Sequence, residues 1–204
     1  MSNEIIILDK DGNDITDNFS KQIKCEFKGD NSKVVIKSPK KIKKAHFILG
    51  DNCRIEIDEN IAIVENLFVW ASARNSQFKI GKNCRIQGLN VSLQDEPDLS
   101  IFIGSYCLIG SNCSIRSSDG HTVYDLKTRE ILNKPGDIVL HEHIWLGRSV
   151  EILKNVEIQK DTVVGMGSIV TKTFNEGNCV LAGRPAKIIK RGINWSNKIT
   201  SDFK

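Results

Sequence analysis

Aliphatic and polar positions along much of the chain recur every six residues. The unit begins with an aliphatic residue, continues with glycine and two polar residues, and ends with a small and a variable residue, as in LGDNCR (49–54), IGKNCR (80–85) and IGSNCS (109–114). From residue 140 the pattern continues without a gap through LHEHIW, LGRSVE, ILKNVE, IQKDTV, VGMGSI and VTKTFN (140–175). Such a regular repeat indicates a solenoid in which each unit packs on its neighbours.

The hexad predicts a short strand followed by a corner. Positions five, six and one alternate inward, outward and inward, as side chains do along a strand. Positions two to four form the corner, and we expect the glycine at position two to supply the backbone freedom that a corner needs. Three strands and three corners close one coil, and stacked coils pair as parallel strands around one core. The predicted fold class is therefore an all-β solenoid, a parallel β-helix.

The repeat also accounts for most of the 6 cysteines. Five occupy the small inward position: Cys53, Cys84, Cys107, Cys113 and Cys179. We expect them to pack as small hydrophobic side chains. The sequence contains no CxxC and no zinc-ligand spacing, so we predict no metal. Unpaired thiols agree with a reducing compartment, which favours a cytoplasmic location.

Composition narrows the possible partners. No apolar run approaches the roughly 18 residues of a membrane span, and the N-terminus lacks the pattern of a signal peptide. Nucleic acid is a poor candidate because only 6% of the residues are aromatic and no recognition motif is present. The net charge of +4 is uneven, and six lysines gather in one stretch: Lys33, Lys37, Lys40, Lys41, Lys43 and Lys44. This cluster is either a solvated edge or a surface that attracts a polyanion.

Three regions are expected along the chain. Residues 1–46 do not follow the repeat and form a strand or hairpin region, in which EIIILDKDGNDITDNF predicts two short strands around a turn. Residues 47–175 form the β-helix, and residues 176–204 form a tail in which IIK (188–190) begins a short capping helix. The repeat breaks after Ile115 and resumes at 138–140, so a loop at about 116–137 must project from the solenoid.

Candidate chemistry lies in that loop and after it. His121 is flanked by Asp119 and Tyr124, and a histidine in a long loop is a candidate general base. Trp145 occupies position six and should point outward, toward a flat ligand or another subunit. VGMGSIVTK (164–172) places glycines at a corner where a ligand can approach the backbone. Downstream cations suit a phosphate: Arg184, Lys187 and Lys190.

These motifs resemble the hexapeptide-repeat acetyltransferases over about residues 80–190. The resemblance is carried by the hexads, by DGH (119–121), and by the run from IWLG through VGMGSIVTK to AGRPAKIIK (144–190). It is closest to relatives of the galactoside and maltose acetyltransferases, and SSDGHTVYD (117–125) is similar to the polysialic acid O-acetyltransferases of bacterial capsules. The resemblance implies a left-handed β-helix, acetyl-CoA as co-substrate, and a homotrimer with active sites between subunits.

Roles follow from the positions that match. Catalytic roles fall to His121 and Trp145. Cofactor contacts are implied for a larger set: Trp145, Gly147, Arg148, Gly165, Met166, Thr171, Lys172, Lys187 and Lys190. Acceptor contacts are expected for Asn90, Asp119, Tyr124 and Arg148. Met166 stands where the family commonly has alanine and Arg148 where it commonly has serine, so a cation at 148 could face an anionic acceptor.

The sequence thus predicts an O-acetyltransferase that acetylates a hydroxyl of a sialic-acid-containing capsular polysaccharide, with His121 as the base. The first alternative is an acetyltransferase for a small acceptor, such as a nucleotide sugar, a sugar, an amino acid or an antibiotic. A second is a zinc site of the carbonic anhydrase kind, formed by His121, His141 and His143, although the last two fall in one corner. The third is a non-catalytic solenoid that does not bind coenzyme A.

Overall fold

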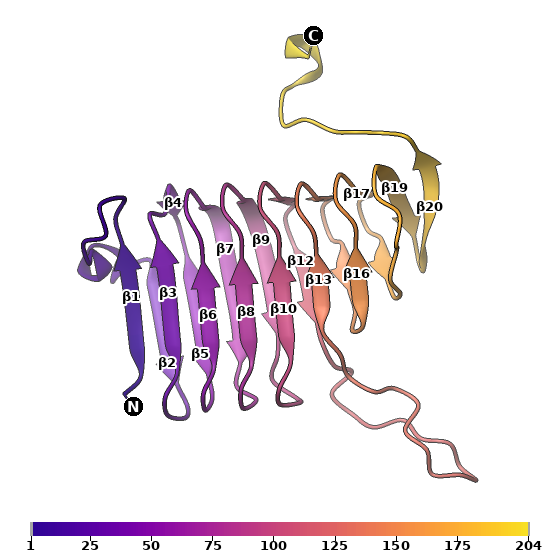
Figure 1. Ribbon diagram of the computed structural model, residues 1–204, viewed down its shortest axis with the longest axis horizontal. Helices are drawn as coiled ribbons and strands as arrows, with labels where there is room; N and C mark the ends of the chain where they lie inside the picture. The colour runs from indigo at the N-terminus through magenta and orange to yellow at the C-terminus, as the bar shows by residue number, and fades with distance from the viewer. Residues whose placement is uncertain (1, 204) are drawn as a thin grey trace.

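The computed structural model describes residues 2–203 and is a parallel β-helix with three flat faces (Figure 1). Face A is the 7-stranded sheet, whose strands are β1 (Glu4–Leu8), β3 (Lys33–Lys37), β6 (Arg54–Ile57), β8 (Gln77–Ile80), β10 (Ser100–Ile103), β13 (Ile138–Leu140) and β16 (Val156–Ile158). Neighbouring strands of this face pair in parallel and in register, coil upon coil. The predicted all-β solenoid is confirmed.

A 13-stranded sheet forms the other two faces, because two long strands, β7 (Ala62–Ala71) and β9 (Arg85–Ser92), run around the corner between them. Face B contains the first halves of β7 and β9. Its other strands are β4 (Lys41–Ile42), β11 (Leu108–Ile109), β14 (Trp145–Leu146), β17 (Val163–Val164), β19 (Cys179–Gly183) and β20 (Ala186–Arg191). Face C contains the second halves of β7 and β9. Its other strands are β2 (Ile23–Phe27), β5 (Ala45–Leu49), β12 (Cys113–Arg116), β15 (Glu151–Ile152) and β18 (Ile169–Val170).

The core follows the alternation of the hexads. The aliphatic first positions of consecutive hexads, such as Leu146, Ile152 and Ile158, are fully buried. The five cysteines at the fifth position are buried and unpaired, as predicted. The hydrogen bond with Cys84, followed by burial, raises the pKa of Cys107, and burial raises the pKa of Cys113. These thiols are therefore packing groups rather than nucleophiles.

The corners differ from the expectation about glycine. The glycines at position two do not have the positive φ angle; it belongs to position four, which is usually a short polar residue such as Asn52, Asn112 or Asp161 at φ of 54° to 58°. Position two is glycine because the next coil lies too close. A Cβ on Gly147 would lie 2.7 Å from the Met166 nitrogen, inside van der Waals contact.

The N-terminal segment was predicted to be a strand or hairpin region that does not follow the repeat; in the structure its strands belong to the β-helix itself. β1 pairs in parallel with β3, and β2 pairs in parallel with β5, so residues 4–49 form the first two coils of the same β-helix. The turn near Gly12 is present, but the second predicted strand is replaced by a 3₁₀ turn, η1 (Thr16–Phe19). The six-residue spacing is lost there because the corner from Phe27 to Lys33, which contains Gly29 and Asn31, is one residue longer than the matching corner from Leu49 to Arg54.

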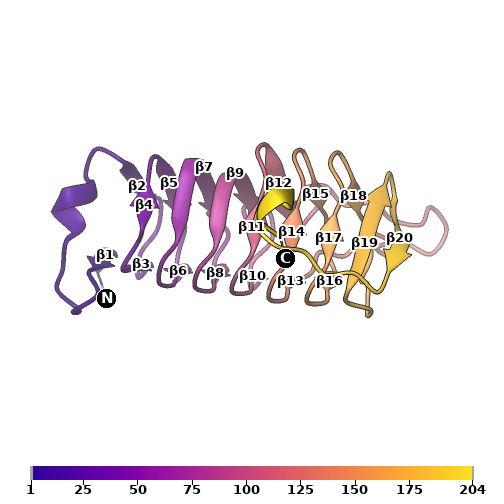
Figure 2. The ribbon, with the colours of Figure 1, turned by 90° about the horizontal axis from the view of Figure 1, so that it is seen from above.

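The C-terminal end also differs from the prediction. Ile188–Lys190 do not begin a helix; they belong to β20, which pairs antiparallel with β19 and closes the last coil. After β20 the tail returns across the top of face B toward the earlier coils (Figure 2). Its one helical segment within residues 2–203 is the short 3₁₀ turn η2 (Thr200–Asp202). No helix in that described range is long and apolar enough to cross a membrane.

Candidate active site

The projecting loop leaves the helix where the sequence predicted it. β12 ends at Arg116 and β13 begins at Ile138, and the segment between them forms a narrow arm that points away from the helix (Figure 1). The base of the arm is fixed by backbone hydrogen bonds from Ser117 to Ser92 (3.3 Å) and from Gly136 to Ser117 (3.0 Å). Farther out its two branches pair antiparallel at Tyr124 and Ile131. His121 therefore lies between an anchored base and a paired outer arm.

One asparagine side chain holds the branch that carries His121. The Asn133 amide donates to the backbone oxygen of His121 (2.8 Å) and to a carboxylate oxygen of Asp119 (3.0 Å). Its own oxygen accepts the backbone N–H of Val123 (2.7 Å). The Lys154 ammonium pairs with the same Asp119 oxygen, and this pair, followed by the Asn133 amide, lowers the pKa of Asp119. The Asp119 carboxylate is thus engaged in holding the arm.

The His121 ring itself is exposed, and within residues 2–203 it makes no hydrogen bond. A base must lie within hydrogen-bond reach of the proton that it takes, and an exposed imidazole can meet a hydroxyl from solvent or from another molecule. Tyr124, farther along the arm, lies under the Arg129 guanidinium, 4.1 Å from the ring centre. The arm therefore fixes the backbone of His121 and leaves its ring open.

Asn90 lies on face C, on the side where the arm begins. It is exposed and stands in register between Phe68 of β7 and Ser114 of β12. Arg116, at the start of the arm, donates to the backbone oxygen of Ser118 (2.9 Å). The predicted acceptor residues Asn90, Asp119 and Tyr124 and the predicted base therefore belong to face C and its arm.

Trp145 lies on the opposite side of the molecule. Its strand β14 is on face B, which is turned toward the viewer in Figure 2, whereas the arm projects from the lower edge of Figure 1. Its indole points outward as predicted, with 39% of its surface exposed, and stands in register between Leu108 and Val163. A single chain therefore does not bring Trp145 and His121 together.

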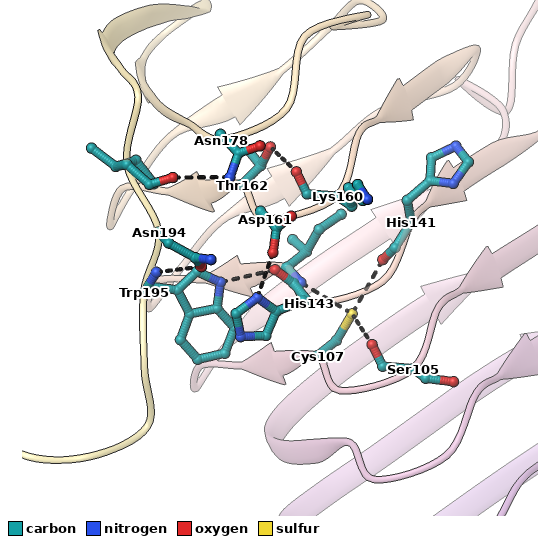
Figure 3. Close-up of polar contacts among 12 residues, drawn as sticks. Ser105, Cys107, His141, His143, Lys160, Asp161, Thr162, Asn178, Asn194 and Trp195 are labelled. Carbon is teal, nitrogen blue, oxygen red and sulfur yellow. Dashed lines mark hydrogen bonds and ion pairs between the residues drawn. The ribbon is translucent and has the colours of Figure 1, made fainter.

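The tail packs beside Trp145 through a tryptophan that the sequence did not single out (Figure 3). The Trp195 ring stacks on His143 with centroids 4.3 Å apart and lies 5.9 Å from Trp145. Its indole N–H donates to the backbone oxygen of His143 (2.8 Å), and the His143 ring is held by Asp161 (2.8 Å). These contacts fix the tail along the corner between faces A and B.

The residues expected at the cofactor fall into two groups. Gly147, Arg148, Gly165 and Met166 follow Trp145 around the corner between faces B and C, where the Met166 side chain is 75% exposed. Thr171 and Lys172 instead follow β18 at the next corner, away from Trp145. There Lys172 and Lys187 line a depression of about 460 Å³ together with Arg191. Lys190 stands opposite Val180 on face B.

The zinc alternative receives no support from the geometry. His141 pairs with Glu157 (2.7 Å) and His143 with Asp161 (2.8 Å), while His121 lies on the arm. In the described part of the chain, no three side chains of the metal-binding types are gathered in one place. The two corner histidines are thus used to link successive coils.

With His121 as the base that the sequence predicts, Asn133→Ala is expected to lower kcat by roughly ten- to a hundredfold, because a small displacement of such a group has effects of this size. The KM for acetyl-CoA should stay within about twofold, since every hydrogen bond of the Asn133 side chain within residues 2–203 is to the arm. Steady-state kinetics with purified protein measure both constants. Thr128→Ala, at the outer end of the arm, is the matched control. An Asn133→Ala protein with unchanged kcat contradicts a positioning role for Asn133.

Comparison with known proteins agrees with this architecture. No family model matches the chain. The chain is 34% identical to the polysialic acid O-acetyltransferase of Neisseria meningitidis over 162 residues, which covers 74% of this chain and 75% of that protein. It is also 34% identical to the galactoside O-acetyltransferase of Lactococcus lactis over 148 residues, 72% of this chain and 67% of that protein. Against the polysialic acid O-acetyltransferase of Escherichia coli O1:K1 the identity is 36% over 97 residues, and the match spans only 31% of that protein.

Solved structures extend the likeness to nearly the whole chain. The polySia-specific acetyltransferase NeuO superposes with a TM-score of 0.82 at 29% identity, covering 98% of this chain and 81% of that one. The polysialic acid O-acetyltransferase OatWY superposes with a TM-score of 0.76 at 27% identity, covering 99% and 93%. The fold has three faces built from six-residue repeats and a projecting arm that carries a histidine. Together with these relatives, it defines the protein as a left-handed β-helix acyltransferase. The chain belongs to the hexapeptide-repeat O-acetyltransferases.

Proposed function

We propose that this protein transfers acetyl from acetyl-CoA to a hydroxyl of a sialic-acid-containing capsular polysaccharide, with His121 as the general base. The observation that carries the proposal is the arm, which leaves the helix beside face C and presents an open imidazole on a fixed backbone. Relatives named polysialic acid O-acetyltransferases supply the acceptor class. The unpaired thiols agree with a reaction in the cytoplasm.

Face B offers a surface that fits acetyl-CoA. Its outward side chains Leu108, Trp145, Val163 and Val180 form an apolar row in register along the helix axis. The row ends at Lys190 on the last coil, where Lys172, Lys187 and Arg191 line the depression described above. An apolar row suits pantetheine, and cations at its end suit the nucleotide phosphates. We assign Trp145, Gly147, Arg148, Gly165 and Met166 to the cofactor side on this ground, and Lys187 and Lys190 to the phosphates.

The two halves of the site require more than one chain. Because Trp145 and His121 lie on opposite sides of one helix, the arm of one subunit must meet face B of a neighbour. A closed ring of subunits provides this contact at every interface. We therefore propose a homotrimer with active sites between subunits.

In the proposed reaction His121 takes the proton of the acceptor hydroxyl while the oxygen attacks the thioester carbonyl. The carbon–sulfur bond breaks, the acetyl group stays on the sugar, and coenzyme A leaves as a thiolate that takes up the proton. A thiol with an ordinary pKa of about 8.5 is a good leaving group, so no separate acid is needed. The buried cysteines make no covalent intermediate.

The test is transfer of label from radiolabelled acetyl-CoA to a panel of acceptors: sialic acid polymers, short sialic oligomers, neutral sugars and serine. We expect label in the sialic polymers. Label only in a small acceptor rejects the polysaccharide and retains the base, whereas failure to bind coenzyme A rejects the enzyme altogether.

A further inference from the structure

We propose that face C carries an extended binding track for an anionic glycan chain, running from Asn90 past Phe68 and Trp70 to the lysines of the first two coils. The inference rests on the proposed function, because it names the surface on which the polymeric acceptor of that reaction lies. The track combines an aromatic platform, a basic end and a continuous path to the arm that carries His121.

The aromatic platform lies on β5 and β7. His46, Phe68 and Asn90 stand in register on three successive strands, and Trp70 stands one outward position farther along β7. The ring centroids of His46 and Phe68 are 5.2 Å apart, and those of Phe68 and Trp70 are 6.3 Å apart. Trp70 keeps 39% of its surface exposed although its neighbours Val69 and Ala71 are fully buried. An exposed Trp70 beside the half-buried rings of Phe68 and His46 marks a binding surface, and such rings suit the C–H faces of sugars.

The far end of the platform is basic. Lys24 stands in register with His46. Lys24, Lys28 and His46 share one carboxylate, that of Glu26, at 2.5, 3.2 and 2.8 Å, so the group retains an excess of positive charge. The hydrogen bond from Lys24, followed by that from His46, lowers the pKa of Glu26 to about 2 and keeps it ionised.

A depression of about 400 Å³ continues this basic end around the corner. Four lysines line it: Lys21, Lys24, Lys43 and Lys44. Glu65 is the acidic residue among its lining side chains. Gln22 lines it too, and its amide oxygen is buried with no partner in residues 2–203, where a sugar hydroxyl could donate. Positive charge with a free acceptor suits a carboxylated sugar.

The platform leads directly to the arm. Beyond Trp70 the next outward residues in register are Ser92 and Arg116. Arg116, where the arm begins, lies 3.6 Å from Asp95, which belongs to the corner between β9 and β10. The Ser92 hydroxyl is buried without a partner among the described residues. Strands lie about 4.8 Å apart, so the path from Asn90 to Lys24 is about 14 Å long. A single sugar does not cover this distance, but a polymer does.

The lysine cluster of the sequence is divided by the fold. Lys33 and Lys37 pair with Glu4 and Asp58 on face A, at 2.8 and 3.5 Å. Lys40 and Lys41 line a separate groove of about 860 Å³, on the side away from the arm. Lys43 and Lys44 alone belong to the track. The pair at 40 and 41 therefore provides a matched control with the same charge and almost the same place in the chain.

The experiment compares K43Q/K44Q and W70A with K40Q/K41Q in the full-length protein. We expect K43Q/K44Q and W70A each to raise KM for long polysialic acid about five- to tenfold, the size expected of one lost stacking or charge contact. KM for acetyl-CoA, and the rate on a sialic acid dimer too short to reach Lys24, should stay within about twofold. K40Q/K41Q should behave as the unmodified protein.

Several results would overturn the track. If K43Q/K44Q or W70A impairs acetylation of the dimer as much as that of the polymer, the track is rejected. The same holds if K40Q/K41Q raises KM for the polymer as much as K43Q/K44Q does. A change in molar mass of W70A by light scattering, with polymer KM unchanged, shows that a second copy of the chain covers the platform. If the unmodified protein acetylates no sialic polymer, the proposed function fails, and calorimetric binding of polysialic acid decides the track. Binding that K43Q/K44Q loses and K40Q/K41Q keeps supports the track; absence of binding rejects it.

Discussion

Replacing His121 with alanine is expected to lower kcat by about 10²–10⁴-fold, the range that general-base catalysis contributes. The acceptor hydroxyl then has no group on the arm to take its proton, while the backbone contacts through Asn133 are unaffected. KM for acetyl-CoA should change little, because the cofactor surface lies on face B. Transfer from labelled acetyl-CoA to polysialic acid measures the loss.

A second histidine provides the control for this prediction. His141→Ala removes a half-exposed imidazole that pairs with Glu157 at the helix corner and does not approach the arm. It should keep kcat within about threefold, and both proteins should unfold at the temperature of the unmodified one, since surface substitutions rarely exceed about 0.5 kcal/mol. A His121→Ala protein that retains more than roughly a tenth of the turnover removes His121 as the base.

The faces of the helix could be predicted from the sequence because burial depends on a strict alternation. Every hexad repeats the same inward and outward positions, so the outward Trp145 and inward Cys113 follow from counting. The arm was visible as a long polar break after Ile115, after which the hexads resume at 138–140. These features are local, and their contacts repeat from coil to coil.

The first two coils were missed for a related reason. β3 alternates correctly, with Val34 and Ile36 buried, but the Gly29–Asn31 corner before it has one residue more than the hexad allows, so counting in sixes does not reach it. IIK (188–190) was taken for the start of a helix because β20 follows no hexad; it pairs antiparallel with β19, which the six-residue repeat does not predict. Corner chemistry, rather than strand alternation, made the middle of the chain recognisable.

The side chains that complete the site could not be found from spacing. Trp195 meets His143 across 52 residues, and Lys154 meets Asp119 across 35. Such pairs depend on where the tail or the arm folds back onto the helix. Neither segment contains the six-residue repeat, so the sequence does not predict its path. The glycine at position two of the hexad was visible in the sequence. The reason for it, the short distance to the backbone of the next coil, appears only when two coils are stacked.

The interface between subunits can be tested by mixing two inactive chains. His121→Ala and Trp145→Ala proteins, produced together with different affinity tags, should form trimers in which one interface pairs an intact His121 with an intact Trp145. Random assembly of equal amounts makes three quarters of the trimers mixed, each with one intact site in three, so activity should return to about a quarter of the unmodified level. Each variant alone should remain at least a hundredfold below it.

The recovery depends on geometry that only neighbouring chains can provide. Within one chain the arm leaves beside face C while Trp145 lies on face B, so no folding of the variant chain can rebuild its own site. Proteins purified separately and mixed without subunit exchange are the control and should show no recovery. If the co-produced sample also stays at the level of the single variants, the two side chains do not meet across an interface. The cofactor surface must then be sought beside the arm, on faces A or C of the same chain.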